Sequence, residues 1–247
     1  MNRHLTMRSG NPALNKNTFK NISTDSSNIM TIDGTVNKTI ISLLILISAS
    51  TYTFFSEITY LIFPGLIGGF IFALITIFKK EWAPYTVPIY AVLEGLALGG
   101  ISAIYESMYT GIVQQAVFLT IGIFSALLFA YKTKIIKVTE NFKLGVFAAT
   151  GGIAIVYFIS FIMSLFGSEL SIMNIENASL MSIGFSFFVV IIASLNLVLD
   201  FDFIEEAAEA NVPKYMEWYA TFGLLITLIW LYLEILRLLA KLQSRRN

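Results

Sequence analysis

The sequence predicts an all-α integral membrane protein, built as a bundle of seven transmembrane helices. Of the 247 residues, 56% are hydrophobic and only 13% are charged, about half the charged fraction of an ordinary soluble domain. The mean hydropathy is +0.76. Residues 39–242 contain seven long apolar stretches, each close to the roughly 20 residues that a helix needs to cross a bilayer. We therefore expect the lipid bilayer to surround most of the chain.

The composition also excludes several classes of function. Basic and acidic side chains number 16 each, so no net positive charge favours a nucleic acid partner. The chain has no cysteine, and its one histidine is His4. These counts exclude a disulfide scaffold, thiolate or histidine metal centres and a His-driven triad. We expect neither an enzyme nor a bound cofactor.

Residues 1–38 form a polar segment that we interpret as a disordered cytoplasmic tail. Asn, Ser and Thr make up 16 of these 38 residues, which leaves too little apolar surface for a core. We expect no cleaved signal peptide, because no short apolar region with a small-residue cleavage site follows the first Met. The first apolar helix then serves as the insertion signal.

The seven predicted spans follow in order, separated by charged residues. Five are free of charge, at residues 39–56, 58–78, 107–131, 144–168 and 177–199. Two more carry one acid each: residues 82–105 contain Glu94, and residues 218–239 contain Glu234. A basic tail at 243–247 ends the predicted membrane domain of residues 39–242.

The distribution of Lys and Arg predicts the orientation. Basic residues lie in the N-terminal tail and in the loops after spans two, four and six, and the loops after spans one, three and five have none. The N-terminus is therefore predicted in the cytoplasm, and seven spans then put the C-terminus outside. Four basic residues lie at that end and oppose this orientation: Arg237, Lys241, Arg245 and Arg246. We expect that the six preceding helices have already fixed the orientation and overrule this late charge cluster. The alternative is a re-entrant seventh span.

Two glycine pairs predict close helix contacts. Gly65 and Gly69 lie in the second span, and Gly95 and Gly99 lie in the third. Both pairs have the spacing that lets two backbones approach closely.

An acid near the middle of a bilayer costs about 2.5 to 3.5 kcal/mol, so each needs a partner, a proton or water. Glu94 lies ten residues after Pro84, which suits the start of the third span. This spacing places Glu94 near mid-membrane, about 15 Å along the helix. Tyr90, on the same face, is its expected hydrogen-bond donor.

The sixth span ends in two acids, Asp200 and Asp202. A stripe of small or polar residues leads to Asp200 on one helix face and should contact protein or water rather than lipid. It consists of Ser182, Ser186, Ala193 and Asn196. Asp202 fits a position among the cytoplasmic headgroups better than Asp200 does.

The seventh span carries Glu217 at its entrance and Glu234 deep within it, about 25 Å apart along the axis. With a turn near residues 210–213, depth pairs Asp200 with Glu217. Glu234 also has a structural interpretation as an intrahelical pair with Arg237 or Lys241.

Three segments together resemble the transmembrane Bax inhibitor motif family in its bacterial branch. They are residues 90–102 (YAVLEGLALGGIS), 199–205 (LDFDFIE) and 231–239 (LYLEILRLL). The resemblance covers residue 30 to the end. It implies a seven-helix bundle with the last helix at its centre, in the bacterial cytoplasmic membrane. It also implies a pH-responsive calcium leak in which one acid on span six and one on span seven share a proton.

The resemblance assigns Asp200 to the first position and Glu234 to the second, with both as calcium contacts. Two departures bear on this pair: the second acid is Glu where the family has Asp, and it lies 34 residues after Asp200. As the partner of Asp200, Glu217 is favoured by its similar depth in the membrane, and Glu234 is favoured by the family motif. We favour Glu234, with a break or tilt of the last helix near Gly223 bringing it level with Asp200.

The expected function is a pH-sensitive leak for calcium or another cation, with protons as the gating ligand. Glu94, Asp200, Asp202 and a span-seven acid would line its pathway, because neighbouring carboxylates titrate as a unit and bind hard cations through oxygen. The alternative is an interaction protein that regulates other membrane proteins or a membrane protease. Two further classes are disfavoured. The seventh span has no Gly-x-Gly-Asp segment of the kind expected in an intramembrane aspartyl hydrolase, and the sequence shows no matching pair of broken helices of the kind expected in a proton-coupled transporter.

Overall fold

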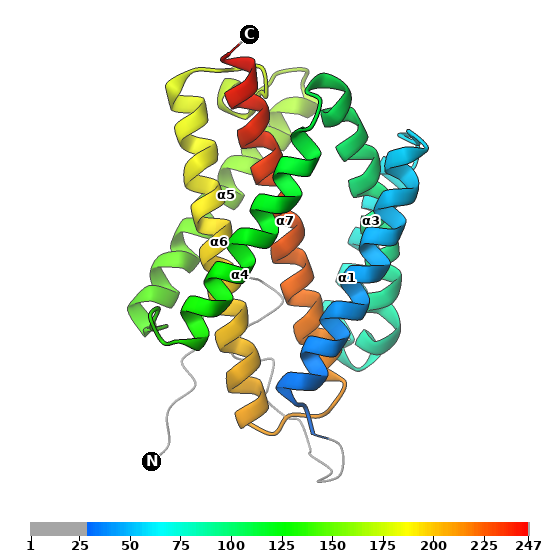
Figure 1. The fold of residues 1–247 in the computed structure, drawn as a ribbon, viewed down its shortest axis with the longest axis vertical. Helices are drawn as coiled ribbons and strands as arrows, with labels where there is room; N and C mark the ends of the chain where they lie inside the picture. Colours follow the sequence, from blue (N-terminus) through cyan, green and yellow to red (C-terminus); the bar gives the residue numbers. More distant parts are fainter. Residues whose placement is uncertain (1–28, 247) are drawn as a thin grey trace. The chain divides into compact units, whose positions relative to one another are not determined.

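The computed structural model describes residues 29–246, which fold into seven α-helices and two single-turn 3-10 helices (Figure 1). The α-helices are α1 (Ile32–Phe55), α2 (Ile62–Phe78), α3 (Ala83–Met108), α4 (Ile112–Lys132), α5 (Glu140–Leu165), α6 (Leu180–Glu209) and α7 (Met216–Ser244). The 3-10 helices are η2 (Lys80–Trp82) and η3 (Ser171–Met173).

The predicted all-α class is confirmed for the described part of the chain. Its one β-type pairing is an isolated bridge between Ile29 and Pro213. Six of the α-helices are long and apolar enough to cross a membrane, and α2, with 17 residues, is shorter. The protein is therefore a multi-pass membrane protein. The seven-span prediction is supported for six spans, and for α2 it stays a prediction.

The first helix starts earlier than the sequence analysis predicted. Thr31 is the N-cap of α1, and its side chain accepts a hydrogen bond from the backbone N–H of Gly34. Asp33 lies in the first turn, where its negative charge interacts favourably with the positive end of the helix dipole. The predicted boundary between residues 38 and 39 therefore lies inside α1. The disorder predicted for residues 1–28 lies outside the described residues.

The last two helices meet at the predicted turn, since α6 ends at Glu209 and α7 begins at Met216. α7 then continues as one α-helix of 29 residues. The expected break near Gly223 is therefore wrong, because α-helical hydrogen bonding runs through this position.

The described chain divides into two compact units. The N-terminal unit comprises residues 29–108 and 202–226, and the C-terminal unit comprises residues 109–201 and 227–246. The C-terminal part of α6 and the N-terminal part of α7 belong to the first of these, and the rest of both helices belongs to the second.

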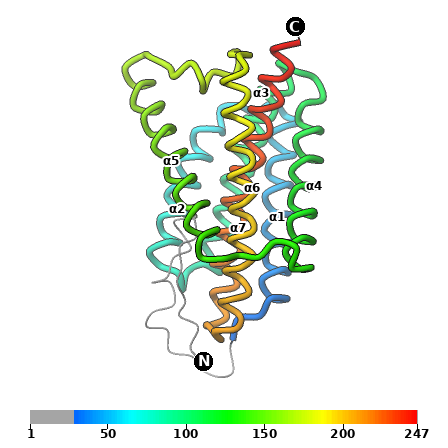
Figure 2. Tube along the Cα trace, turned by 90° about the vertical axis from the view of Figure 1, so that its left-hand side faces the viewer, coloured from blue at the N-terminus to red at the C-terminus, as the bar shows by residue number. Residues whose placement is uncertain are grey.

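In the N-terminal unit, whose helices can be followed in Figure 2, α3 packs against both α1 and α2. The glycine pairs that the sequence singled out lie at these contacts. A Cβ atom on Gly65 would lie 2.7 Å from the carbonyl oxygen of Leu93 on α3. A Cβ atom on Gly99 would meet the carbonyl oxygen of Ser50 and the hydroxyl of Thr53 on α1. The predicted close contacts are confirmed, because only glycine lets these backbones approach so far.

The C-terminal unit contains the two most exposed candidate spans. Only 11% of the apolar window is buried in α4 and in α5, against 56% in α6 and 61% in α7. Phe118 and Phe158 are among the large apolar side chains that α4 and α5 expose. Such surfaces suit lipid contact. On the inner side, Ile153 of α5 packs with Val189 and Ile192 of α6.

Candidate functional site

The five acids predicted from the sequence lie on three helices and differ in burial. Asp200 on α6 and Glu217 on α7 have no exposed surface, and Glu234 on α7 is 2% exposed. Glu94 on α3 and Asp202 on α6 are half-buried. Asp200, Glu217 and Glu234 are therefore the carboxylates for which neighbouring groups must replace water.

Glu217 joins the start of α7 to the start of α1. Its Oε1 atom accepts hydrogen bonds from the backbone N–H of Thr31 at 2.9 Å and from the Thr31 hydroxyl at 3.0 Å. Its Oε2 atom forms an ion pair with Lys38, which lies on α1 about two turns after Thr31. Lys214, half-exposed, lies 3.9 Å from Oε1. We call Thr31, Lys38 and Glu217 the clasp.

Neighbouring groups hold the clasp in position. The backbone N–H of Met30 donates to the carbonyl of Val212 at 2.8 Å. A Cβ atom on Gly34 would collide with the carboxylate of Glu217, so the glycine leaves room for it. The ammonium of Lys38 also lies 5.8 Å from the centre of the Trp218 ring, within reach of a cation–π interaction.

Glu234 forms a second cluster, with Arg237 and Tyr157. Nη1 of Arg237, one turn later on α7, donates to both carboxylate oxygens at 2.8 and 2.9 Å. The hydroxyl of Tyr157 on α5 donates to Oε1 at 2.6 Å and accepts from Arg237 at 2.9 Å. The predicted intrahelical pair is confirmed with Arg237, and we call these three residues the Glu234 cluster.

Lys241, the other expected partner of Glu234, binds the loop between α5 and α6. It has no exposed surface, and its Nζ donates to the carbonyl of Ile172 at 2.7 Å and to the hydroxyl of Ser186 at 2.9 Å. A third contact reaches the carbonyl of Ser182 at 3.3 Å. Lys241 therefore fixes the end of α7 to both α6 and this loop.

The stripe leading to Asp200 faces protein, as predicted. Ser182, Ser186, Ala193 and Asn196 are each no more than 2% exposed. Asn196, one turn before Asp200, donates from Nδ2 to the hydroxyl of Thr150 on α5 and to the carbonyl of Ile192, both at 2.8 Å. The stripe therefore joins α6 to α5 beside the buried carboxyl.

Glu94 is the twelfth of the 26 residues of α3, near the middle of the helix, and its position at mid-membrane stays a prediction. Its carboxylate packs against α2 at Gly69, where a Cβ atom would collide with it. Tyr90 is buried, and its ring packs edge-on against Phe222 at 5.0 Å between centroids. The expected hydrogen bond from the Tyr90 hydroxyl to Glu94 stays a prediction.

The two units divide the predicted acids between them. Asp200 and Glu234 belong to the C-terminal unit, and Glu94, Asp202 and Glu217 belong to the N-terminal unit. Within residues 29–246 no group of three or more Asp, Glu, His or Cys side chains could hold a metal ion. A calcium ion at any of these acids would need backbone carbonyls or water as further ligands.

Sequence reasoning missed the partners that complete both clusters. Lys38 and Thr31 were assigned to a disordered tail, although Thr31 followed by an acid in the first helical turn is a signal for a helix start. No comparable signal identifies Tyr157, because it lies 77 residues before Glu234 and pairs with it only through the packing of α5 on α7.

Comparison with protein families gives a match to the family described as Bax inhibitor 1 like. It covers residues 11–244, nearly the whole chain. Comparison with individual curated proteins gives no match. The resemblance inferred from three short segments is thus confirmed, and the chain belongs to the Bax inhibitor 1 like family.

Proposed function

We propose that this protein is a pH-sensitive cation leak of the bacterial cytoplasmic membrane, with calcium as the permeant ion. One observation carries the proposal: Asp200, Glu217 and Glu234 are at most 2% exposed on two helices that are apolar enough to cross a membrane. Acids in such positions are expensive and commonly mark ion pathways or proton relays. In this proposal α2 also crosses the membrane, since 17 residues span about 25 Å, and α7 is the central helix.

Asp200 is the first group that we propose to be controlled by protonation. Oδ1 of Asn196 is buried, and no hydrogen-bond donor reaches it among the described residues. It lies one helical turn before Asp200, on the same face. A protonated Asp200 has an O–H to donate there, whereas an ionised Asp200 adds a negative charge beside a second acceptor. Protonation therefore favours the packed arrangement of α6, and loss of the proton favours its rearrangement.

Glu234 is the second proposed group, since it shares the C-terminal unit with Asp200. A proton on Glu234 would weaken its ion pair with Arg237, and a permeant cation would compete with Arg237 for the same oxygens. Glu217 has a different role in this proposal. Its contacts with Thr31 and Lys38 hold two helix starts together.

Helix geometry favours two separate groups over one shared proton. Asp200 lies nine residues before the end of α6, and Glu234 lies eighteen residues after the start of α7. If the two helices leave their turn antiparallel, the two acids differ by about 13 Å in depth. Asp200 and Glu234 then act in series along the pathway.

Calcium flux into proteoliposomes, measured across a series of pH values, tests the proposal. Asp200→Asn and Glu234→Gln should each flatten the pH dependence, because each amide keeps the shape and removes the titration. Glu140→Gln is the control, since Glu140 is an exposed acid in the same unit as Asp200 and Glu234, and its pH dependence should stay close to that of the unmodified protein. No calcium flux in the unmodified protein at any pH would remove the proposal and leave the interaction protein as the alternative.

A further inference from the structure

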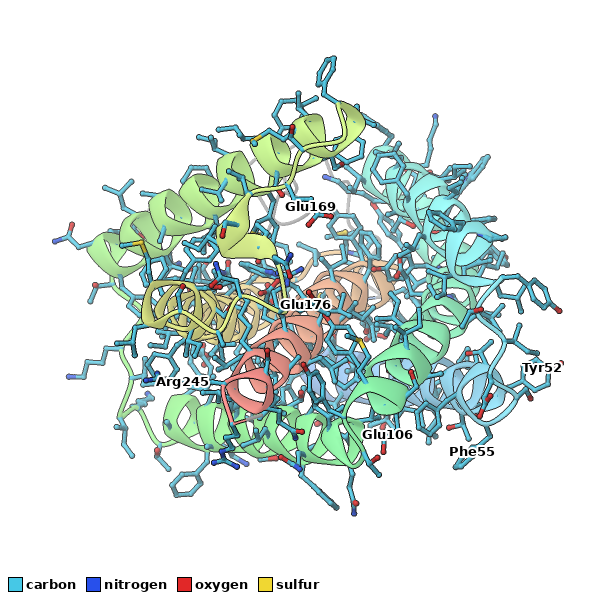
Figure 3. The ribbon with its side chains drawn as sticks, turned by 90° about the horizontal axis from the view of Figure 1, so that it is seen from above. Tyr52, Phe55, Glu106, Glu169, Glu176 and Arg245 are labelled. Atoms are coloured by element: carbon cyan, nitrogen blue, oxygen red, sulfur yellow. The ribbon has the colours of Figure 1, made fainter. Side chains whose placement is uncertain are left out.

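An open pocket of about 630 Å³ lies in the C-terminal unit. Its walls come from α5, from the loop at residues 166–179 and from α7. Figure 3 shows Glu169 and Glu176 on this loop, and both line the pocket. Tyr157 and Arg237 of the Glu234 cluster also line it. Pockets between about 300 and 1,000 Å³ are the usual size for small organic ligands.

The charges around the pocket favour a cation. Arg237 is already balanced by its ion pair with Glu234. Glu169 and Glu176 are exposed, and neither takes part in a salt bridge with another residue of the 29–246 range. Two carboxylates in the lining of a pocket attract positively charged solutes and disfavour anions.

The rest of the lining favours an organic cation over a metal ion. Phe161, Leu170, Met173 and Ile175 contribute apolar surface to the walls. Calcium and magnesium are bound by six or more oxygen ligands, and no group of three acidic, His or Cys side chains suitable for a metal occurs in the described chain. Apolar walls with a few charged groups are typical of sites for organic molecules.

We infer that this pocket binds a small organic ammonium compound, with its charged nitrogen at Glu169 and Glu176 and its apolar part against Phe161 and Met173. The inference concerns binding alone and does not depend on the proposed leak.

The loop that forms one wall of the pocket is held in place by hydrogen bonds from two helices. Lys241 of α7 and Ser182 of α6 both donate to the carbonyl of Ile172, at 2.7 and 3.1 Å. The hydroxyl of Ser244 donates to the carbonyl of Glu176 at 3.3 Å. A wall fixed before the ligand arrives reduces the entropy lost on binding. The same contacts connect the pocket to α7, which also carries Glu234.

Calorimetric titration of the full-length protein in detergent with 2-phenylethylammonium chloride tests the inference. Its neutral analogue 2-phenylethanol has nearly the same shape and should bind at least threefold more weakly. The double variant Glu169→Gln, Glu176→Gln should bind the ammonium compound about three- to twentyfold more weakly, because two partly exposed charge pairs are lost. Raising the salt concentration should weaken binding to the unmodified protein.

Glu140→Gln is the matched control, since Glu140 is an exposed acid at the opposite end of α5. It should leave the affinity unchanged, and so should Asp200→Asn, which alters the proposed leak and not the pocket. Equal affinity for the alcohol and the ammonium compound would overturn the inference. So would unchanged binding in the double variant, or no binding of the ammonium compound at millimolar concentration.

Discussion

The ammonium of Lys38 on α1 forms an ion pair with the fully buried carboxylate of Glu217 on α7, although 179 residues separate them in the sequence. The side chain of Lys38 is only 18% exposed. An ion pair so far removed from water is costly to break from one side, since the remaining charge stays buried. Breaking the clasp between α1 and α7 should therefore lower the free energy of unfolding by a measurable amount.

Replacing Lys38 with Met should destabilise the protein strongly. Removing one partner of a buried ion pair costs about 3 to 5 kcal/mol, and partial exposure of Lys38 brings the expected loss to about 2 to 3 kcal/mol. Unfolding in detergent, followed by circular dichroism, measures this loss. Lys214→Met is the control, because Lys214 is half-exposed and 3.9 Å from Glu217, and it should cost less than about 1 kcal/mol. Equal losses in the two variants would contradict the clasp.

Gly99→Ala should weaken the contact between α3 and α1. The added Cβ atom would meet the backbone carbonyl of Ser50 and the hydroxyl of Thr53, and the backbone cannot move aside without shifting a helix. Overpacking of this kind costs about 1 to 3 kcal/mol. Gly122→Ala on α4 is the matched control, since nothing lies within 4 Å of its added Cβ atom. It should be neutral or slightly stabilising, through helix propensity. Thermal unfolding of both variants tests the difference in sign.

Tyr157→Phe should change the pH dependence of calcium flux if Glu234 contributes to gating. The substitution removes the 2.6 Å hydrogen bond to Glu234 and keeps the ring. Arg237→Met removes another donor to the same carboxylate, so both variants should move the midpoint of the pH profile in the same direction. Tyr85→Phe, at an exposed tyrosine, should leave it unchanged. Midpoint shifts of opposite sign would argue against a common target.

Asp200→Asn and Glu234→Gln should have additive effects on the pH profile. Groups that act in series at different depths contribute independently, whereas groups that share one proton do not. Flux measurements on both single variants and the double variant decide between these mechanisms. A double variant no more affected than either single one would restore the shared-proton pair that the family resemblance implies.

Cysteine labelling should find residues 57, 106 and 169 outside and residue 245 on the same side. The chain contains no native cysteine, so Glu57→Cys, Glu106→Cys, Glu169→Cys and Arg245→Cys each carry one reactive thiol. The four basic residues near the C-terminus oppose this orientation less than their number suggests, because Arg237 is paired with Glu234 and Lys241 is buried. Glu205→Cys serves as the control for the cytoplasmic side. Labelling of residue 245 from the cytoplasm alone would favour a re-entrant last span.

The sequence was sufficient for the order of the helices and for the buried stripe on α6, because both follow from local patterns. Charge-free runs of about 20 residues predict spans directly, and small or polar residues at helical spacing predict a face turned from lipid, as Ser186 and Asn196 confirm. Gly65 and Gly99 also identified helix contacts from local sequence alone, because a residue without a side chain lets two helix backbones approach closely.

The partners of the acids were less predictable, since they depend on long-range packing. Lys38 lies among Asn and Thr residues whose composition indicates a tail, and only Glu217, far along the chain, gives the lysine a place in the fold. Tyr157 is one of several aromatic residues on α5, and periodicity alone does not distinguish it. The unbroken α7 likewise required the structure, because Gly223 is compatible with a break and with a continuous helix.

The clasp also has a consequence for the order of biosynthesis. A ribosome that adds 5 to 20 residues per second needs about 10 to 35 s between Lys38 and Glu217. During this interval the start of the first helix lacks the carboxylate that later binds both the Lys38 ammonium and the Thr31 backbone. The contact can form only when synthesis of the seventh helix has begun, so a nascent chain that stops before residue 217 cannot complete its own amino-terminal helix contacts.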